Sequence, residues 1–528
     1  MKIRNRWLTA PLAAGVAAGL LSGCGSEAGS SSGSGESVVM GMSDDIQAID
    51  PASGYDPGSW LLFNNVFQSL LSFPKGSSTP QPEAAERCSF DKGGSQVFRC
   101  LLRSGLKFSN GHALTSKDVK FSFERVLRIN DPNGPAPLLS TLGRIDTPDE
   151  LTVVFHLKVP DATFPSKIAS GAGSIVDSET YPAGKLRTDG KAIGSGVYKL
   201  DAFGEKQASF SVNSSYKGTA KVKNSGMTMK LFHGRQKELA QALRDGDIDL
   251  AYRGLTAKDI ADLQASSVAD KKGIKVVEGT SAEVQHLVFN MSDPVAGKLA
   301  VRKAVAYLVD REALVRDVYK STATPLYSIV PSGITAHSTS FFDTYGGSPD
   351  PAKARQVLRK AGLTGKVKLT LWSTPIRYGP GTDDELKAIA KQLNDSGLFE
   401  ADVKSVDFKQ YEQDIAAGKY GVYVKGWIPD YPDPDNFTSP FFGKGNVLSN
   451  HYVNKTVTDE IIPSTSATED RAATEAEFTR LQDTVANDVP ILPLWQGKQY
   501  AVAHEGVVGL EWTLDPSTVF RFWEISKA

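Results

Sequence analysis

The segment "SGLKFSNGHALTSKDVKFSFERVL", residues 104–127, holds the clearest structural signal in the sequence. Thr115 and Asp118 stand three positions apart, which is the spacing of a capping box with Asp in place of the usual Glu. The two residues of a capping box satisfy backbone N–H groups that the first helical turn leaves without partners. We therefore expect a helix to begin directly after Thr115.

Strands and helices alternate on the C-terminal side of this helix. The segment "LTVVFHLKV", residues 151–159, alternates apolar and polar positions as a half-buried strand does, and Pro160 ends it. A helix is predicted where Asp350 supplies the cap, Pro351 occupies the first turn and Gly362 ends the run. The sequence shows no repeat of solenoid length. This mixture predicts an α/β fold.

Length and composition set the class of protein. A chain of 528 residues is too long for one hydrophobic core, so roughly three structural units are expected. Hydrophobic residues make up 40% and charged residues 23%, and the formal net charge is −1. Because the sequence has no excess of Lys and Arg, we expect no nucleic-acid partner.

The N-terminal segment differs from the rest of the chain. Basic residues precede a short, mainly apolar run from Trp7 to Leu21, which is typical of an export signal over residues 1–23. The signal ends in "LSGC", which resembles the lipobox of bacterial lipoproteins and predicts lipidation (palmitate) of Cys24. The alternative is an ordinary secretory peptide with a chance cysteine. Residues 24–37 are rich in Gly and Ser and are expected to form a flexible tether.

Cys88 and Cys100 remain once Cys24 is set aside. Exported proteins form disulfides readily, and the turn-forming sequence "KGGS" between the two segments predicts a hairpin that brings the sulfurs together. We expect these two cysteines to form a disulfide. The alternative is a pair of reduced, buried thiols.

The segment "GWIPDYPDPDNF", residues 426–437, places three aspartates among aromatic residues and prolines. It does not fit a calcium loop, since the sixth residue counted from Asp430 is Asp435 rather than Gly. The seven histidines are scattered, so no metal site is expected. For Asp433 and Asp435, hydrogen bonds to turn backbone are the simplest interpretation.

Six stretches, taken in order, resemble the oligopeptide- and dipeptide-binding family of solute receptors of bacterial ABC importers. They are residues 104–127, "IGSGVYKL" (193–200), "QALRDGDIDLAY" (241–252), "LVFNMSDP" with "AVRKAVAYLVDREALV" (287–315), "GWIPDYPDPDNF" (426–437) and "NDVPILPLWQ" (487–496). The "GSGVY" within the second stretch departs from the family's usual Gly-Thr-Gly-Pro-Tyr. The resemblance covers the chain from Val38 onward.

The resemblance implies a two-lobed, periplasmic-binding-protein-like fold that closes on a ligand like a hinged trap. The first lobe, with an extra subdomain, would hold residues 38–282, the second lobe residues 283–497, and residues 498–528 would return to the first lobe. Such a receptor catalyses nothing and needs no cofactor.

The resemblance also implies site residues. Asp430 matches the position that holds the α-ammonium of a peptide ligand, with Trp427 and Tyr431 as walls. Arg377, in "STPIRYGPG", matches the position that binds the ligand carboxylate, and Tyr378 would line the same wall. The alternatives are a loop in which Asp430 is only structural and an Arg377 that pairs with Asp383 or Asp384 on the surface.

We expect a monomeric receptor, lipid-anchored on the extracytoplasmic face of the cell membrane, that captures short peptides and delivers them to the permease subunits of an ABC importer. Members of the same family bind metal chelates, siderophores and amino-acid-like metabolites, so these ligands form the first alternative. A secreted hydrolase that uses two of the carboxylates, and a signalling or chaperone-like surface protein, are further alternatives.

Overall fold

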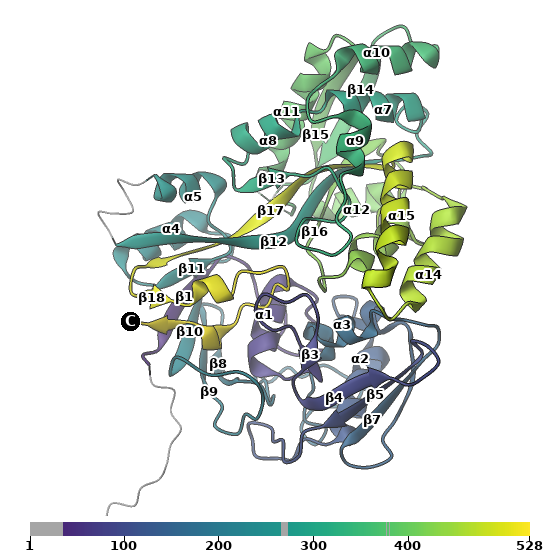
Figure 1. Ribbon diagram of the computed structural model, residues 1–528. Helices are drawn as coiled ribbons and strands as arrows, with labels where there is room; N and C mark the ends of the chain where they lie inside the picture. Colours follow the sequence, from purple (N-terminus) through teal and green to yellow (C-terminus); the bar gives the residue numbers. More distant parts are fainter. Residues whose placement is uncertain (1–34, 266–272, 376, 380) are drawn as a thin grey trace, which may run out of the picture.

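The computed structural model describes residues 35–265, 273–375, 377–379 and 381–528 and shows the mixed α/β architecture that the sequence predicts (Figure 1). The predicted signal segment, Cys24 and all but the end of the predicted tether lie outside the described residues. Within the described part of the chain, no helix is both long and apolar enough to cross a membrane.

Two long antiparallel strands, β12 (Ile274–Phe289) and β17 (Ile491–His504), lie side by side across the middle of the molecule (Figure 1). The main sheet has the order β15-β14-β16-β12-β17-β11-β1-β10-β9-β8, and β13 adds to β17. Its other strands are β1 (Val38–Met42), β8 (Tyr198–Phe203), β9 (Gln207–Val212), β10 (Gly226–Leu231), β11 (Leu250–Tyr252), β13 (Ala323–Pro325), β14 (Val367–Ser373), β15 (Phe399–Ser405) and β16 (Val422–Trp427). The pairing of β12 with β17 changes register between Thr280 and Val284.

The hydrophobic core on one side of this register shift is separate from the cores on the other side. One core is built from residues between Ala282 and Trp495, and we call this part the second lobe. The other cores are built mainly from residues before Ala282 and after Gln499, and we call this part the first lobe. The long strands β12 and β17 therefore belong to both lobes.

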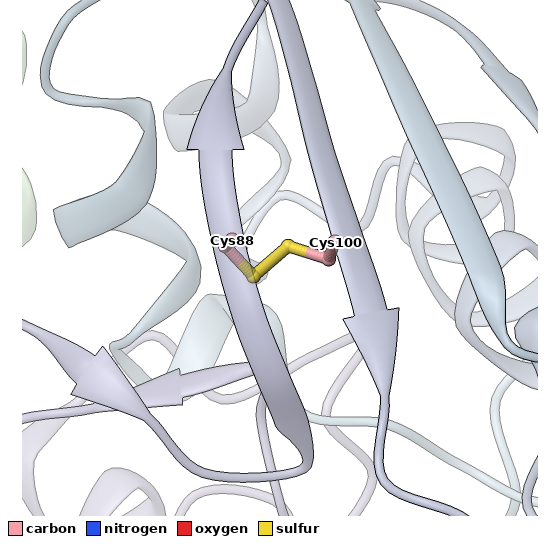
Figure 2. The surroundings of a disulfide bond; sticks show 2 residues. All are labelled: Cys88 and Cys100. Carbon is pink, nitrogen blue, oxygen red and sulfur yellow. A yellow bond between two sulfur atoms is a disulfide. The ribbon is translucent and has the colours of Figure 1, made fainter.

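A separate sheet of four strands lies in the first lobe, in the order β4-β5-β7-β6. The strands are β4 (Ala85–Phe90), β5 (Val97–Leu102), β6 (Leu142–Asp146) and β7 (Thr152–Leu157). Cys88 on β4 stands opposite Cys100 on β5, and a disulfide joins them (Figure 2). Helix α2 (Ser116–Ile129) packs on this sheet, where the rings of Phe123 and Phe155 lie 5.2 Å apart.

The helix starts follow the caps expected from the sequence. The Asp118 carboxylate accepts hydrogen bonds from the backbone N–H and the hydroxyl of Thr115, both at 2.9 Å, so α2 begins with a capping box. Asp350 caps the helix that follows it and accepts from the Lys353 N–H at 2.9 Å. Besides α2, the α-helices of the described residues are α1 (Pro57–Val66), α3 (Phe164–Ile168), α4 (Gln236–Asp245), α5 (Ala257–Gln264), α7 (Leu299–Leu308), α8 (Arg311–Asp317), α9 (Ser340–Tyr345), α10 (Pro351–Lys360, the helix that Asp350 caps), α11 (Thr382–Asp395), α12 (Phe408–Ala416), α13 (Ser439–Phe442), α14 (Ile462–Ala467) and α15 (Glu475–Asp488).

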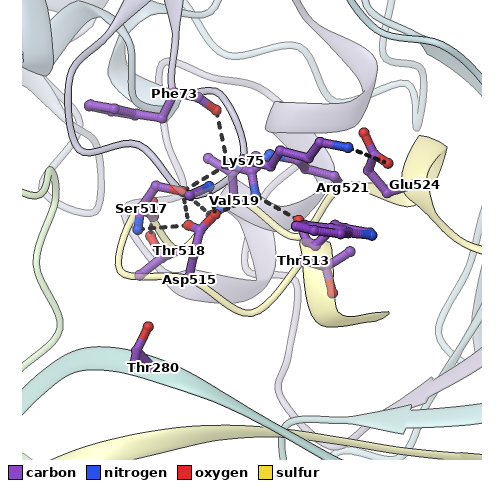
Figure 3. A network of polar contacts seen from close by, with 12 residues as sticks. Phe73, Lys75, Thr280, Thr513, Asp515, Ser517, Thr518, Val519, Arg521 and Glu524 are labelled. Atoms are coloured by element: carbon purple, nitrogen blue, oxygen red, sulfur yellow. Dashed lines mark hydrogen bonds and ion pairs between the residues drawn. The ribbon is translucent and has the colours of Figure 1, made fainter. Parts of the chain in front are cut away.

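The C-terminal segment returns to the first lobe through a buried polar network (Figure 3). The guanidinium of Arg521, only 2% exposed, donates to the Asp515 carboxylate at 2.8 Å and to the Phe73 carbonyl at 2.9 Å. The Gln499 amide donates to the carbonyls of Asp515 at 2.8 Å and Thr280 at 2.9 Å. The network thus fixes the C-terminal segment to both long strands. Short strands β18 (Val507–Val508) and β19 (Ser526–Lys527) pair nearby, and β2 (Leu71–Ser72) pairs with β3 (Gln81–Pro82).

Candidate interlobe ligand site

The aspartate-rich segment follows β16 at the end of the second lobe that meets the first lobe. Asp433 caps a short 3₁₀ helix (Pro434–Phe437), and its carboxylate accepts from the Asp435 N–H at 2.8 Å. Pro434 occupies the first turn of this helix, where its missing N–H costs nothing. The predicted turn role of Asp433 is therefore present, and the turn holds the segment in place.

Asp430 lies buried where the two lobes touch, with 8% of its surface exposed. The Tyr55 hydroxyl of the first lobe donates to one carboxylate oxygen at 2.6 Å, and the Asn436 amide donates to the other at 3.1 Å. No Lys, Arg or His among the described residues forms an ion pair with this carboxylate. Asp430 is thus a buried acid held by neutral donors.

Burial is also the main electrostatic influence on Asp430. Removing the carboxylate from water disfavours its charged form and raises the pKa of Asp430 to about 6, although the hydrogen bonds from Tyr55 and Asn436 work in the opposite direction. A cation beside this group would favour the ionised form and offset the cost of burial.

Two neighbouring acids do have cationic partners. Lys167 lies 2.8 Å from Asp161 in the first lobe, and Arg471 donates to both oxygens of Asp433 at 2.7 and 2.8 Å in the second. Asp435 has no such ion pair within the described part of the chain, and burial raises its pKa to about 6. The junction between the lobes therefore carries more negative than positive charge.

The sequence-based expectation for Tyr431, a wall facing the ligand, differs from its position in the structure. The side chain is 3% exposed and belongs to a core cluster that is otherwise made of first-lobe residues such as Phe155 and Ile168. Its hydroxyl donates to the Asp435 carboxylate at 3.2 Å. Burial of the Tyr431 ring in this core is favourable because it removes apolar surface from water. In this conformation the ring packs the second lobe against the first lobe.

Hydrogen bonds to backbone carbonyls of α14 also join the lobes at this place. The Ala162 N–H of the first lobe donates to the Ser466 carbonyl of the second at 2.7 Å, and the Ser95 hydroxyl donates to the Ala467 carbonyl at 2.9 Å. Helix α14 therefore contacts the first lobe beside the four-stranded sheet (Figure 1).

Trp427 is half-buried and is linked to Asp430 through Asn436. The indole N–H of Trp427 donates to the Asn436 amide oxygen at 2.9 Å, and the same oxygen accepts from the Asp430 N–H at 3.0 Å. The ring packs against Phe441 with centroids 5.2 Å apart. The structure thus brings Trp427 and Asp430 together.

Arg377 and Tyr378 lie on the loop between β14 and α11. Arg377 is exposed, with its guanidinium carbon 5.1 Å from the centre of the Phe408 ring. The surface ion pair proposed as an alternative is not formed, because Asp383 accepts from Ser373 and Ser405, and Asp384 pairs with Lys387. No contact between Arg377 and Asp430 is formed in this conformation of the described residues.

Tyr378 packs over the end of β16. A Cβ added to Gly426 would lie 3.0 Å from its ring, so only glycine fits there without displacing the tyrosine. Glu385 lies deeper, where it accepts from the indole N–H of Trp495 at 2.9 Å and from Gln285, and burial raises its pKa to about 7. This end of the second lobe is therefore lined by aromatic and buried polar groups.

Sequence reasoning did not identify Tyr55, Trp60 and Asn436. Tyr55 is 40% exposed although its hydroxyl reaches Asp430, so the junction borders solvent at this point. The rings of Tyr55 and Trp60 lie 5.6 Å apart, and the buried indole N–H of Trp60 has no partner among the described residues. Asn436 belongs to the quoted segment, whereas Tyr55 lies 375 positions before Asp430.

The described residues contain no group of three or more His, Cys, Asp or Glu side chains placed to hold a metal ion. Asp430 is held by the neutral donors Tyr55 and Asn436, whereas Asp433 pairs with Arg471.

Known proteins resemble the chain over nearly its whole length. Di/tripeptide-binding protein 3 of Pseudomonas aeruginosa is 26% identical over 87% of this chain and 89% of its own. Heme-binding protein A of Haemophilus influenzae is 25% identical over 84% of each chain. The solved structure of the ABC transporter-associated periplasmic binding protein DppA from Helicobacter pylori, in complex with the peptide STSA, has the same fold, with a TM-score of 0.78, 20% identity and coverage of 93% of this chain and 98% of that one.

The family comparison covers most of the chain. Residues 79–449 match the bacterial extracellular solute-binding proteins, family 5 (middle), and this stretch contains both the four-stranded sheet and the segment around Asp430. Both lobes thus contribute residues to the match. The chain belongs to the bacterial extracellular solute-binding proteins of family 5.

Proposed function

We propose that this protein is an extracytoplasmic receptor that captures short peptides between its two lobes and delivers them to the permease subunits of an ABC importer. The observation that carries the proposal is the carboxylate of Asp430, buried between the lobes and held by neutral donors without a cationic partner in the described part of the chain. The names of the peptide-binding relatives support the same ligand class.

The free energy of desolvation explains why such a carboxylate suits a peptide. The α-ammonium of a peptide loses its hydration when the lobes close, which costs several kcal/mol unless an ionised partner is already in place. Asp430 supplies that partner on a segment fixed by Pro434 and Asn436, so little ordering cost remains at binding. The Tyr55 hydroxyl then connects the ammonium site to the first lobe.

The carboxylate end of the peptide is assigned to Arg377. Its guanidinium is exposed on the loop beside Tyr378 and forms no ion pair within the described residues, so its donors are free for a ligand carboxylate. A planar guanidinium suits a carboxylate because two N–H groups can donate in parallel. Trp427 and Tyr378 would line the space between the two charges.

Movement of the lobes is proposed to occur at the long strands. The register shift of β12 against β17 between Thr280 and Val284 supports chain crossings near residues 283 and 497. The ligand closes the lobes only if it binds the closed form more tightly than the open form. We further propose that Cys24 carries the lipid anchor, that the receptor is a monomer and that it does not alter its ligand.

Calorimetry on the purified protein tests the ligand class directly. Di- to pentapeptides with free amino termini are expected to bind with micromolar or lower Kd, while single amino acids, heme and a nickel–histidine chelate bind at least about 100-fold more weakly. Heme is included because a heme-binding relative is similar over most of the chain. Preferential binding of heme or the chelate would overturn the proposal, and so would hydrolysis of the bound peptide detected by mass spectrometry.

A further inference from the structure

A cavity of about 410 Å³ lies inside the first lobe. It is enclosed by the end of α1, the β2–β3 pair, residues 216–223 and the C-terminal segment that the Arg521 network holds in place (Figure 3). None of the residues assigned to the interlobe site lines it. Its volume lies within the range of small-molecule sites, which begins at roughly 300 Å³.

The inner wall is aromatic and contains one unsatisfied acceptor. Phe63, Phe67 and Phe73 are buried there. Gln68 is 3% exposed, and its amide nitrogen donates to the Glu83 carboxylate at 3.0 Å and to the Lys217 carbonyl at 3.1 Å. Its amide oxygen has no hydrogen-bond partner among the described residues. A buried acceptor of this kind costs free energy unless a donor reaches it.

Glu83, on the same wall, does not donate to the Gln68 amide oxygen. Its carboxylate accepts from Gln68, from the Tyr216 hydroxyl at 2.7 Å and from the Thr219 hydroxyl at 2.8 Å. These neutral donors saturate the carboxylate and orient the Gln68 amide so that its oxygen stays free. Gln68 lines the cavity. A rotation of its side chain that exposes this oxygen would offer an acceptor to a bound molecule that brings an N–H or an O–H.

The rim of the cavity is positively charged. Lys75, Lys221 and Lys223 line it and are exposed, whereas Glu524 is buried. Lys75 and Lys223 share the Glu524 carboxylate at 3.5 and 2.7 Å, while Lys221 forms no ion pair within the described part of the chain. Three lysines around the Glu524 carboxylate leave an excess of positive charge at the opening, while the second carboxylate of the lining, Glu83, lies on the inner wall.

We propose that this cavity is a second ligand site, separate from the interlobe site, for a small aromatic carboxylate that carries a ring N–H or O–H. The ring occupies the aromatic wall, the ring donor meets the Gln68 amide oxygen, and the carboxylate lies at the lysine rim. Offset contacts between aromatic rings add to the apolar area that the ring buries. The site requires neither a metal nor a covalent step.

The test uses indole-3-propionate as the probe and calorimetry on the full mature chain. We expect one probe molecule to bind per protein with a Kd below about 1 mM, and saturating peptide to leave that Kd unchanged within twofold. Naphthalene-1-acetate, which lacks the ring donor, should bind at least about tenfold more weakly, because the Gln68 oxygen then stays unpaired. No binding of indole-3-propionate, or competition by peptide, would overturn the proposal.

Variants locate the probe. Ala220→Trp fills the cavity from a half-buried lining position and should abolish probe binding, while its unfolding midpoint and peptide affinity match those of the wild type. Lys221→Gln should raise the Kd of the probe at least threefold. Lys237→Gln, at an exposed lysine on α4, should leave that Kd unchanged. Unaltered probe binding in Ala220→Trp would refute the assignment. Because the probe is measured first without peptide, a failure of the peptide proposal would not affect this result.

Discussion

At the residue scale, the properties of Asp430 follow from the balance between burial and hydrogen bonding. Its two neutral donors do not offset the loss of water, so its pKa is raised to about 6. Near neutral pH the ligand-free protein therefore contains a buried charge that has no ion-pair partner among the described residues, although the positive charge of Lys167 favours its ionised form. Such a group lowers stability, and under the proposed function the same charge attracts the cationic end of the ligand, a trade-off that is typical of binding sites.

The cost of this charge can be measured through its pH dependence. The pKa of Asp430 is about 6 in the folded chain and near 3.8 when unfolded, so the folded state holds its proton more tightly. The free-energy cost of burying the charge is therefore absent below pH 3.8. It grows as the pH rises between the two pKa values, so that folding stability falls, and it is complete above pH 6. We expect Asp430→Asn to raise the free energy of unfolding by about 1–3 kcal/mol at pH 8 and by much less at pH 4.5.

Urea denaturation of peptide-free protein at both pH values measures this difference. Asp384→Asn, at an exposed position paired only with Lys387, is the matched control and should show no such pH-dependent gain. An equal effect of Asp430→Asn at the two pH values would show that the buried carboxylate does not titrate as proposed.

Arg377 permits a matched experiment in which the peptide and the protein are each changed. If its guanidinium binds the ligand carboxylate, Arg377→Gln should weaken the binding of a dipeptide with a free C-terminal carboxylate by about 2 kcal/mol, roughly 30-fold in Kd. The same variant should leave the C-terminally amidated dipeptide nearly unaffected, since the partner charge is already missing. Calorimetry with both peptides decides the point, and equal losses for the two would assign Arg377 a purely structural role.

At the element scale, local sequence patterns correctly predicted the helix starts, because a helix cap depends only on residues close together in the sequence. The capping box starts α2 directly after Thr115, and Asp350 caps α10, because each cap needs only a side chain and the backbone three residues on. The predicted strand at 151–159 is present as β7, which ends at Leu157, earlier than Pro160 would require. Element boundaries depend on sheet pairing, and sequence alone does not show that pairing.

The site was only partly predictable for the same reason. Trp427, Asp430 and Asn436 lie within one short segment, so their proximity follows from the sequence. The contact of Asp430 with Tyr55 joins residues 375 positions apart and follows no local period. The burial of Tyr431 among first-lobe residues also depends on how the lobes meet, which the sequence does not show.

The disulfide on the β4–β5 pair should contribute to stability. Cys88 and Cys100 are 12 residues apart, and closing a loop of this length is worth about 3 kcal/mol in the chain-entropy description. Replacing both, with Cys88→Ser and Cys100→Ala, should lower the free energy of unfolding by about 2–3 kcal/mol. Urea denaturation of the wild type with reductant is the matched control and should give a similar loss, whereas an unchanged midpoint in either experiment would contradict the prediction.

At the scale of the whole molecule, the structure shows two lobes joined by continuous strands and touching through α14 and Tyr431. A ligand that binds only between them stabilises the folded chain by mass action. At a peptide concentration 100 times Kd, we expect the free energy of unfolding to rise by about 2.7 kcal/mol. Thermal unfolding with and without peptide measures this gain. Asp430→Asn should show little of it at the same peptide concentration.

Closure should also be visible as a change in distance between the lobes. Spin labels at the exposed positions Lys92 in the first lobe and Lys455 in the second would report this distance by electron paramagnetic resonance. Peptide should shift the population toward one short distance, and Asp430→Asn should keep the ligand-free distribution. An unchanged distribution on saturation with peptide would show that binding does not move the lobes.

The central claim is that Asp430 binds the α-ammonium of a peptide, and N-acetylation of the peptide tests it most directly. Calorimetry would compare a tripeptide and its N-acetylated twin on the wild type and on Asp430→Asn. We predict that acetylation costs at least about 3 kcal/mol on the wild type and less than about 1 kcal/mol on the variant, because the charge partner is then gone. Equal affinity of the wild type for the free and the acetylated peptide would contradict the claim.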